Sequence, residues 1–254
     1  MRDDPIFVIG IERSGSTLLQ RLLNSVDGVL IYGEHGALLC HSAILYRQAH
    51  DFSKEFSADI SETVAEITLR DPKMWIAKCG AYQLDRINKA TCAMVEAVAN
   101  PFGNQKIRWG FKEVRYGSET FVRTMLINLY PKCKIVHTVR HPVDHVLSKM
   151  KKGWFSSLEE CMHWYVKKVS VFSEGASLHP DRIKLLRYED MTETSFCALF
   201  EWLGLKWGPV QKDVLSTVVD TDARSSTTVA LTPEQYAYIF EKTKALTVYD
   251  PKPV

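Results

Sequence analysis

The chain has 254 residues, of which 46% are hydrophobic and 24% are charged, close to the average of a globular domain. This composition excludes a disordered chain, a collagen or coiled-coil rod, and a miniprotein held by disulfides. Lys and Arg number 32 and Asp and Glu number 30, so the net charge is +2 and no basic excess favours nucleic acid as a partner. The longest stretch without these charged residues, His35 to Tyr46, is too short to cross a bilayer, so we expect no membrane partner.

The six cysteines are far apart along the chain, and no two form a Cys-x-x-Cys pair. Scattered thiols indicate a reducing compartment and give no sign of a zinc site. The first residues also lack the basic-then-apolar pattern of a secretion signal. We therefore expect a cytoplasmic protein, or a domain of a larger soluble one.

Short apolar runs alternate with helical patterns along the chain, beginning with a strand at 6–11 that is followed by apolar residues at helical spacing. This alternation predicts an α/β fold, with a parallel sheet of about five strands flanked by helices. The stretch from 37 to 105 is helix-compatible without a good strand, and we interpret it as a helical insertion that caps a ligand site. We expect one domain over 1–254. The predicted strands are 6–11, 29–32, 107–111, 134–139 and 182–186.

The loop after the first strand, Gly10-Ile-Glu-Arg-Ser-Gly15-Ser16-Thr17, leads directly into an amphipathic helix. Gly15 permits a tight turn, and amides at a helix N-terminus can bind a phosphate or sulfate. The Gly-x4-Gly spacing matches a nucleotide P-loop, but Ser16 stands where that loop has Lys. The strand at 134–139 is followed by Arg140 and not by the Asp that would help to hold Mg²⁺. We therefore expect an anion site without a metal. The alternative is an ordinary strand-to-helix turn.

A second candidate anion site follows the strand at 134–139, where Pro142 favours the start of a helix. Arg140 offers a planar set of donors, and Ser148 lies two turns into that helix, so the two could bind one phosphate. Lys152, four residues after Ser148, lies on the same polar side of that helix. Alternatively, Arg140 could simply pair with Asp144.

Three segments resemble motifs of the sulfotransferases that use 3′-phosphoadenosine 5′-phosphosulfate (PAPS). Arg13-Ser-Gly-Ser-Thr-Leu-Leu19 resembles their 5′-phosphosulfate loop, and Arg140 with Ser148 resembles their 3′-phosphate motif. Arg187-Tyr188-Glu189-Asp190 is similar to their Tyr-Glu-Asp element. The motifs come in the family's order, each at a strand end, so the resemblance implies a P-loop-like sulfotransferase fold.

The resemblance also implies roles for individual residues. Lys152 would join the 3′-phosphate group, Tyr188 would lie near the adenine, and Arg224 is the candidate for a C-terminal basic loop, although the family's fuller Arg-Lys-Gly pattern is absent. The residues implied to hold the 5′-phosphosulfate are Arg13, Ser14, Gly15, Ser16 and Thr17, and those for the 3′-phosphate are Arg140 and Ser148.

Candidate residues for the transfer step follow the second and third strands. Glu34, in Gly33-Glu-His-Gly36, is similar in position to the Glu that acts as base in the trehalose and protein-tyrosine branches of the family. Its alternative role is to cap the helix expected near 37, and His35 is the rival base. Lys112 would approach the transferred sulfate and its leaving oxygen, or else be a surface lysine. Arg13 would add positive charge there.

We therefore expect an enzyme that moves a sulfuryl group from PAPS to a hydroxyl, or alternatively a nitrogen, of a small-molecule acceptor such as a natural product. The second product would be 3′-phosphoadenosine 5′-phosphate (PAP). The sequence leaves two alternatives, a P-loop kinase or NTPase and an inactive nucleotide-binding module. It leaves the acceptor and the oligomeric state open.

Overall fold

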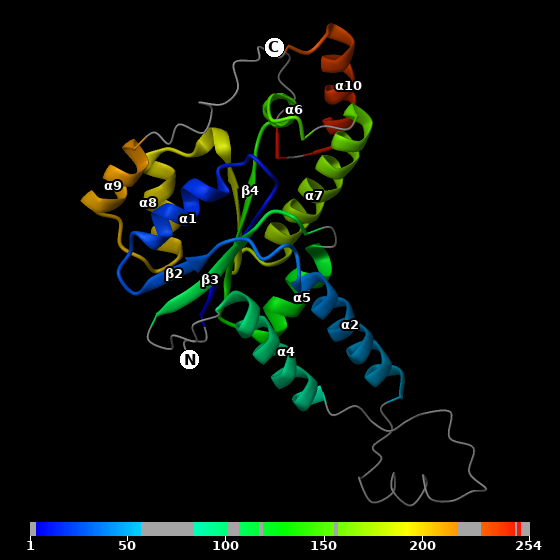
Figure 1. Ribbon diagram of the computed structural model, residues 1–254, viewed down its shortest axis with the longest axis vertical. Helices are drawn as coiled ribbons and strands as arrows, with labels where there is room; N and C mark the ends of the chain where they lie inside the picture. The colour runs from blue at the N-terminus through cyan, green and yellow to red at the C-terminus, as the bar shows by residue number, and fades with distance from the viewer. Residues whose placement is uncertain are drawn as a thin grey trace, which may run out of the picture.

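The five strands expected from the sequence form one parallel sheet in the order β2-β3-β1-β4-β5 (Figure 1). This computed structural model describes residues 4–56, 84–100, 107–116, 119–154, 157–217, 230–246 and 248–249. β3 continues to Glu113, beyond the predicted end at Phe111, so Lys112 belongs to the strand. The strands are β1 (Ile6–Gly10), β2 (Val29–Tyr32), β3 (Arg108–Glu113), β4 (Lys134–Val139) and β5 (Ile183–Arg187).

Helices cover both faces of the sheet, as predicted (Figure 1). On one face lie α1 (Ser16–Asn24) and α8 (Glu193–Trp202), with α9 (Pro209–Ser216) packed against α1. A short 3₁₀ turn, η1 (Tyr188–Asp190), precedes α8. The helices that contribute to the core on the other face are α2 (Leu39–Phe56), α4 (Leu84–Ala99), α5 (Glu119–Leu129), α6 (Pro142–Lys151), α7 (Leu158–Leu178) and α10 (Pro233–Thr243).

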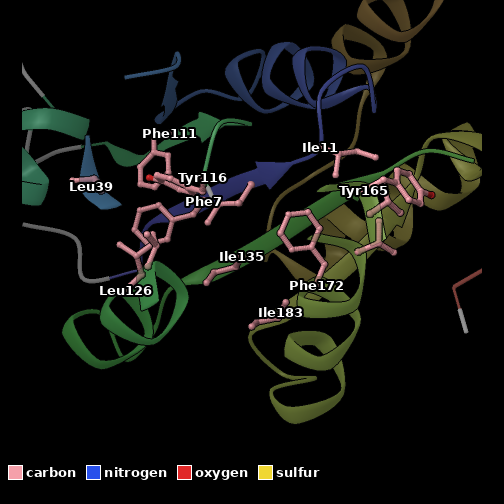
Figure 2. Close-up of a cluster of buried hydrophobic side chains, with 14 of the residues drawn as sticks. Phe7, Ile11, Leu39, Phe111, Tyr116, Leu126, Ile135, Tyr165, Phe172 and Ile183 are labelled. Atoms are coloured by element: carbon pink, nitrogen blue, oxygen red, sulfur yellow. The ribbon is translucent and has the colours of Figure 1, made fainter. Parts of the chain in front are cut away.

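The alternation of side chains along the buried strands divides the core into two clusters. Ile6 and Val8 of β1 face α1 and α8, and Phe7 and Ile9 face α5 and α7. Figure 2 shows the second cluster, in which the Phe7 ring lies 4.8 Å from that of Phe111. Aromatic rings bury large apolar areas, so this cluster is a main source of stability for the strands that carry the site.

The stretch from 37 to 105 contributes α2 and α4, and its described residues contain helix and no strand, as the sequence predicted. The two helices pack against each other, and α2 packs against α5. Residues 57–83 and 101–106 lie outside the described part, so the capping role of this insertion stays a prediction. None of the helices that the structure describes has the length and apolar character that a bilayer span requires.

The strand order explains where a ligand site can form. β1 lies between β3 and β4, so Val8 pairs with Lys112 on one side and with Val136 on the other. The chain after β1 crosses to β2 on one side, and the chain after β3 crosses back to β4 on the other. In parallel sheets, ligands bind outside the carboxyl ends of the strands where the connections diverge in this way.

Gly110 permits the close pairing of β3 with β1. A Cβ at this position would lie 1.7 Å from the carbonyl oxygen of Ile6, so the strands could not keep their distance. We predict that Gly110→Ala lowers the free energy of unfolding by about 3 kcal/mol or more. Gly33→Ala is the matched control, because a Cβ there meets nothing within 4 Å. Urea titrations of both variants would measure the loss, and equal stability of the two would contradict this reading of the sheet.

Candidate functional site

Two residues in left-handed backbone conformations shape the loop after β1, Arg13 with φ of 62° and Gly15 with φ of 78°. Gly15 is the N-cap of α1 and brings no capping side chain, so the first amides of the helix keep their donor capacity. A Cβ at Gly15 would lie 2.5 Å from the sulfur of Met191, which leaves room only for glycine. The loop therefore has the form of an anion site at a helix N-terminus.

Ser14 fixes this loop to the sheet. Its hydroxyl donates to the carbonyl oxygen of Ile11 at 2.6 Å and shares a hydrogen bond of 2.7 Å with the hydroxyl of Thr138. Ser14 and Ser16 are buried, whereas Thr17 is exposed. The Ser14 side chain thus positions the loop, and the Thr17 hydroxyl is the more accessible of the predicted hydroxyl ligands.

The structure joins the two predicted anion motifs directly. Arg13 Nε donates to Ser148 Oγ at 3.0 Å, although 135 positions separate them in the sequence. Arg140 Nη1 donates to the carbonyl oxygen of Arg13 at 3.2 Å. Hydrogen bonds therefore connect Arg140 and Ser148, the residues of the second motif, to Arg13 in the loop after β1.

Arg140 is held beside the loop by an aromatic ring. Its guanidinium lies 4.5 Å from the ring centroid of Tyr188, and its Nε is buried without a hydrogen-bond partner. The structure describes both Arg140 and Asp144, and no ion pair joins them, so the alternative pairing considered from the sequence is wrong. A buried, unpaired donor next to a carbonyl and a ring has the chemistry of a site that expects an anion.

The Arg187-Tyr-Glu-Asp190 segment organises the same region. Arg187 donates to Asp190 at 2.8 Å, and Glu189 accepts from the backbone N–H of His141 at 2.7 Å. These bonds place the Tyr188 ring against both Arg140 and Gly15. The segment therefore connects the end of β5 with the start of α6.

Of the two remaining predicted nucleotide residues, the structure describes one. Lys152 is the C-cap of α6, one turn after Ser148. Arg224 lies outside the described residues. Across the part of the chain that the structure describes, no three His, Cys, Asp or Glu side chains are grouped as a metal ion would need.

Glu34 lies between two cations, which contradicts a role limited to capping a helix. Its carboxylate pairs with Lys112 through Oε1 and with Arg115 Nη2 at 2.9 Å through Oε2. Only 8% of the Lys112 side chain is exposed, against 24% for Glu34, so the lysine is not an ordinary surface residue. The structure thus brings the predicted base and the predicted lysine into contact at the carboxyl edge of β2 and β3.

His35 points into the protein. Its ring packs against Phe111 and shares a hydrogen bond of 2.9 Å with the hydroxyl of Tyr116. Burial lowers the pKa of His35, and the nearby Glu113 carboxylate only partly offsets this effect. This buried setting favours Glu34 over His35 as the base.

A cavity of about 340 Å³ is lined by the loops after β1 and β3 together with α6 and α7. Arg115, which pairs with Glu34, lines its wall, and Trp154 and Trp164 line it with rings that are 57% and 41% exposed. Glu12 also lines the cavity. Burial raises the pKa of its carboxyl, but Lys168 and Lys149 lower this pKa by more, so it falls below its ordinary value. The remaining lining residues are Ile11, Tyr116, His145, Lys149, Glu160, Cys161, Tyr165 and Lys168.

Comparison with known families gives a match to the sulfotransferase family over residues 5–209. The chain belongs to this family. The matched range includes β1 to β5 and every predicted site residue except Arg224. Comparison of this sulfotransferase with curated proteins gave no match.

Solved structures of other sulfotransferases share the fold at low sequence identity. The sulfotransferase domain of the Synechococcus PCC 7002 olefin synthase is 18% identical, with a TM-score of 0.52 and coverage of 98% of this chain and 97% of that one. STF1 of Mycobacterium tuberculosis is 15% identical, with a TM-score of 0.53 and coverage of 97% and 77%. Mouse SULT7A1 complexed with PAP is 13% identical, with a TM-score of 0.52 and coverage of 98% and 87%. The P-loop-like sulfotransferase fold expected from the motifs is confirmed.

Most residues of the cavity could not be identified from the sequence. Nothing in the sequence marks Trp154 or Trp164 as neighbours of the loop after β1, because the two lie far along the chain from it. The sequence did contain one signal, the carboxylate of Glu12 inside a loop that otherwise suits anions. A carboxylate in this loop would repel a bound anion, so it indicates that this part of the loop faces something other than the anion.

Proposed function

We propose that this sulfotransferase moves the sulfuryl group of PAPS to a hydroxyl, or alternatively a nitrogen, of a small-molecule acceptor. The observation that carries the proposal is the convergence of Arg13, Arg140 and Ser148 next to the uncapped N-terminus of α1. Two separate phosphate groups, as in PAPS, suit the helix N-terminus with Arg13 for one group and Arg140 with Ser148 for the other. A nucleotide without a 3′-phosphate would leave the buried Arg140 Nε unsatisfied.

In this proposal the 5′-phosphosulfate accepts hydrogen bonds from the amides after Gly15 and from Thr17. The 3′-phosphate takes the place of the Arg13 carbonyl oxygen at Arg140 and accepts a hydrogen bond from the Ser148 hydroxyl. Charge-assisted hydrogen bonds are stronger than neutral ones, so this exchange favours the bound nucleotide. Tyr188, on which Arg140 lies, has a ring that is 41% exposed and could accept the flat face of an adenine.

The transfer step would use Glu34 as general base. The acceptor hydroxyl gives its proton to the Glu34 carboxylate, and its oxygen forms the new bond to sulfur. The bond between sulfur and the 5′-phosphate oxygen breaks with its electron pair, which leaves PAP. Lys112, now paired with Glu34, would stabilise the negative charge that develops on the leaving oxygen.

The cavity lined by Arg115, the ion-pair partner of Glu34, is our candidate for the acceptor site. A volume of about 340 Å³ suits a small molecule, and the exposed faces of Trp154 and Trp164 suit a ring. In this proposal the acceptor binds among the loops after β1 and β3, α6 and α7. PAP is bound in the mouse SULT7A1 structure and in that of retinol dehydratase, and two neighbours come from the olefin synthase and the curacin biosynthetic pathway. These relatives support PAPS as donor and a natural product as acceptor.

Arg140→Ala should weaken the binding of PAP by about 10- to 100-fold, because a 3′-phosphate loses its charged donor. Adenosine 5′-phosphosulfate has no 3′-phosphate, so its affinity should change far less. Isothermal calorimetry with both ligands measures the difference, with the exposed Arg86→Ala as control. Equal losses for both ligands would refute the assignment, and Mg²⁺-dependent binding of ATP in place of PAP would favour the kinase alternative.

Glu34→Gln should lower kcat by roughly 10²–10⁴-fold with little effect on PAP affinity, because an amide of the same shape cannot accept the acceptor proton. His35→Ala should cost less, since the ring is buried against Phe111 and is hydrogen-bonded to Tyr116. Steady-state kinetics on both variants decide between them. Near-normal turnover by Glu34→Gln, together with an inactive His35→Ala, would transfer the role of base to the histidine.

Trp164→Ala should raise the KM for the acceptor by about tenfold through loss of a stacking surface, and leave PAP binding unchanged. Leu178→Ala is the matched control, since Leu178 is exposed on the same helix and does not line the cavity. Acceptor saturation curves at fixed PAPS provide the measurement. If both variants keep the wild-type KM, the acceptor binds elsewhere and the insertion at 37–105 becomes the better candidate.

A further inference from the structure

Glu113 carries a buried carboxylate whose charge is met by backbone amides. Its Oε2 accepts from the N–H groups of His35 at 3.0 Å and Ala37 at 2.9 Å. Its Oε1 accepts from those of Val114 at 2.9 Å and Arg115 at 3.0 Å. The side chain is fully buried, with His35 Nδ1 at 3.6 Å. One carboxylate therefore binds two separate loops.

The pKa of Glu113 agrees with this geometry. Burial alone would raise the pKa of this carboxyl, but the amides of Ala37, Val114 and Arg115 lower it below its ordinary value. The group is therefore a charged carboxylate at neutral pH. A buried charge costs free energy unless its hydrogen bonds are complete. Each carboxylate oxygen accepts from two amides of one loop, so replacing one oxygen breaks the link between the two loops.

The loop after β2 has a backbone that needs support. Gly36 and Ala37 follow each other with φ of 68° and 60°, and Ala37 has a Cβ that disfavours this left-handed region. The ladder between β2 and β3 extends only to the pair Tyr32 and Phe111. Beyond that pair, the Glu113 side chain supplies the connection between the two segments that the sheet no longer provides.

The two segments joined by Glu113 carry the proposed base and its partners. Glu34 precedes His35 in the first segment, and Lys112 and Arg115 flank Glu113 in the second. The Glu34 contacts with Lys112 and Arg115 span these same segments. We propose that Glu113 is a positioning residue, which fixes Glu34 relative to Lys112 by holding the left-handed turn at Gly36 and Ala37. This inference rests on the proposed function.

Glu113→Gln tests the role, because glutamine keeps the shape but presents an NH₂ group to one amide pair. We expect kcat to fall by about 100-fold, as misplaced reacting groups do. PAP affinity and binding stoichiometry should stay unchanged, since the proposed nucleotide residues follow β1, β4 and β5 and none of them contacts Glu113. Turnover is expressed per PAP-binding site, which removes any effect of a misfolded fraction. Amide hydrogen exchange at His35 and Ala37 should become faster in the variant.

Ala37→Gly separates positioning from general stability. Glycine adopts the left-handed conformation without strain, so this change alone should leave kcat nearly unaltered. Added to Glu113→Gln, it should recover about tenfold of the lost turnover, because the turn then needs less support from the carboxylate. Failure of Ala37→Gly to recover any activity would overturn the proposed route through the turn.

Ala37→Val covers the case in which Glu113→Gln does not fold. A β-branched residue opposes the left-handed turn while Glu113 stays intact, so kcat should fall and PAP binding should persist. Leu38→Val, at the exposed neighbouring position, is the control. Normal turnover by Ala37→Val, or unchanged amide exchange at His35 and Ala37 in a folded Glu113→Gln, would refute the inference. Absence of sulfuryl transfer by the wild-type chain would instead refute the proposed function, and the exchange data would still decide whether the carboxylate holds the turn.

Discussion

The pairing of β1 with β3 on one side and β4 on the other is the constraint on which the site depends. Because the three strands are parallel and adjacent, their carboxyl ends bring together loops that are far apart in sequence. The contact between Arg13 and Ser148 exists only because of this pairing. The buried aromatic residues around Phe7 keep the strands in place, so the geometry of the site depends on the packing of the core.

The cationic side chains at this edge are held before any anion arrives. Arg13 contacts the Ser148 hydroxyl, Arg140 contacts a carbonyl oxygen and the Tyr188 ring, and Lys112 contacts Glu34. Two of these three cations therefore rest on neutral partners, which an anionic ligand can displace at small cost. Side chains that are already ordered lose little conformational entropy on binding, and this favours both affinity and transition-state stabilisation.

The strands and their alternation with helices could be predicted from the sequence, because strands buried on both faces are short runs of apolar residues. The residues of the loop after β1 could also be predicted, since glycine and small polar residues between a strand and a helix suit few other purposes. The orientation of the Ser14 hydroxyl toward Thr138 could not, because it depends on a partner in another strand.

The helix after β4 shows the same limit. The spacing of Val143, Val146, Leu147 and Met150 puts them on one side of this helix, yet only Val143 and Val146 are buried, and Leu147 and Met150 are partly buried. His145 takes a fully buried place, because its ring donates a hydrogen bond to the carbonyl oxygen of Glu12. Polarity-based patterns assign histidine to the surface, and only the tertiary contact reverses that assignment. Glu113 escaped prediction for a related reason, since its four partners are backbone groups that carry no sequence signature.

His145 has a further consequence for the chemistry beside it. Burial lowers the pKa of this imidazole to about 3, with Lys149 adding to the effect. The ring is therefore uncharged near neutral pH. Since it lines the cavity next to Glu12, an occupant meets a wall whose histidine does not titrate in that range. If the affinity of the cavity for a ligand changes between mildly acidic and neutral pH, a group other than His145 must ionise. The pKa of the ligand itself is then the first quantity to measure.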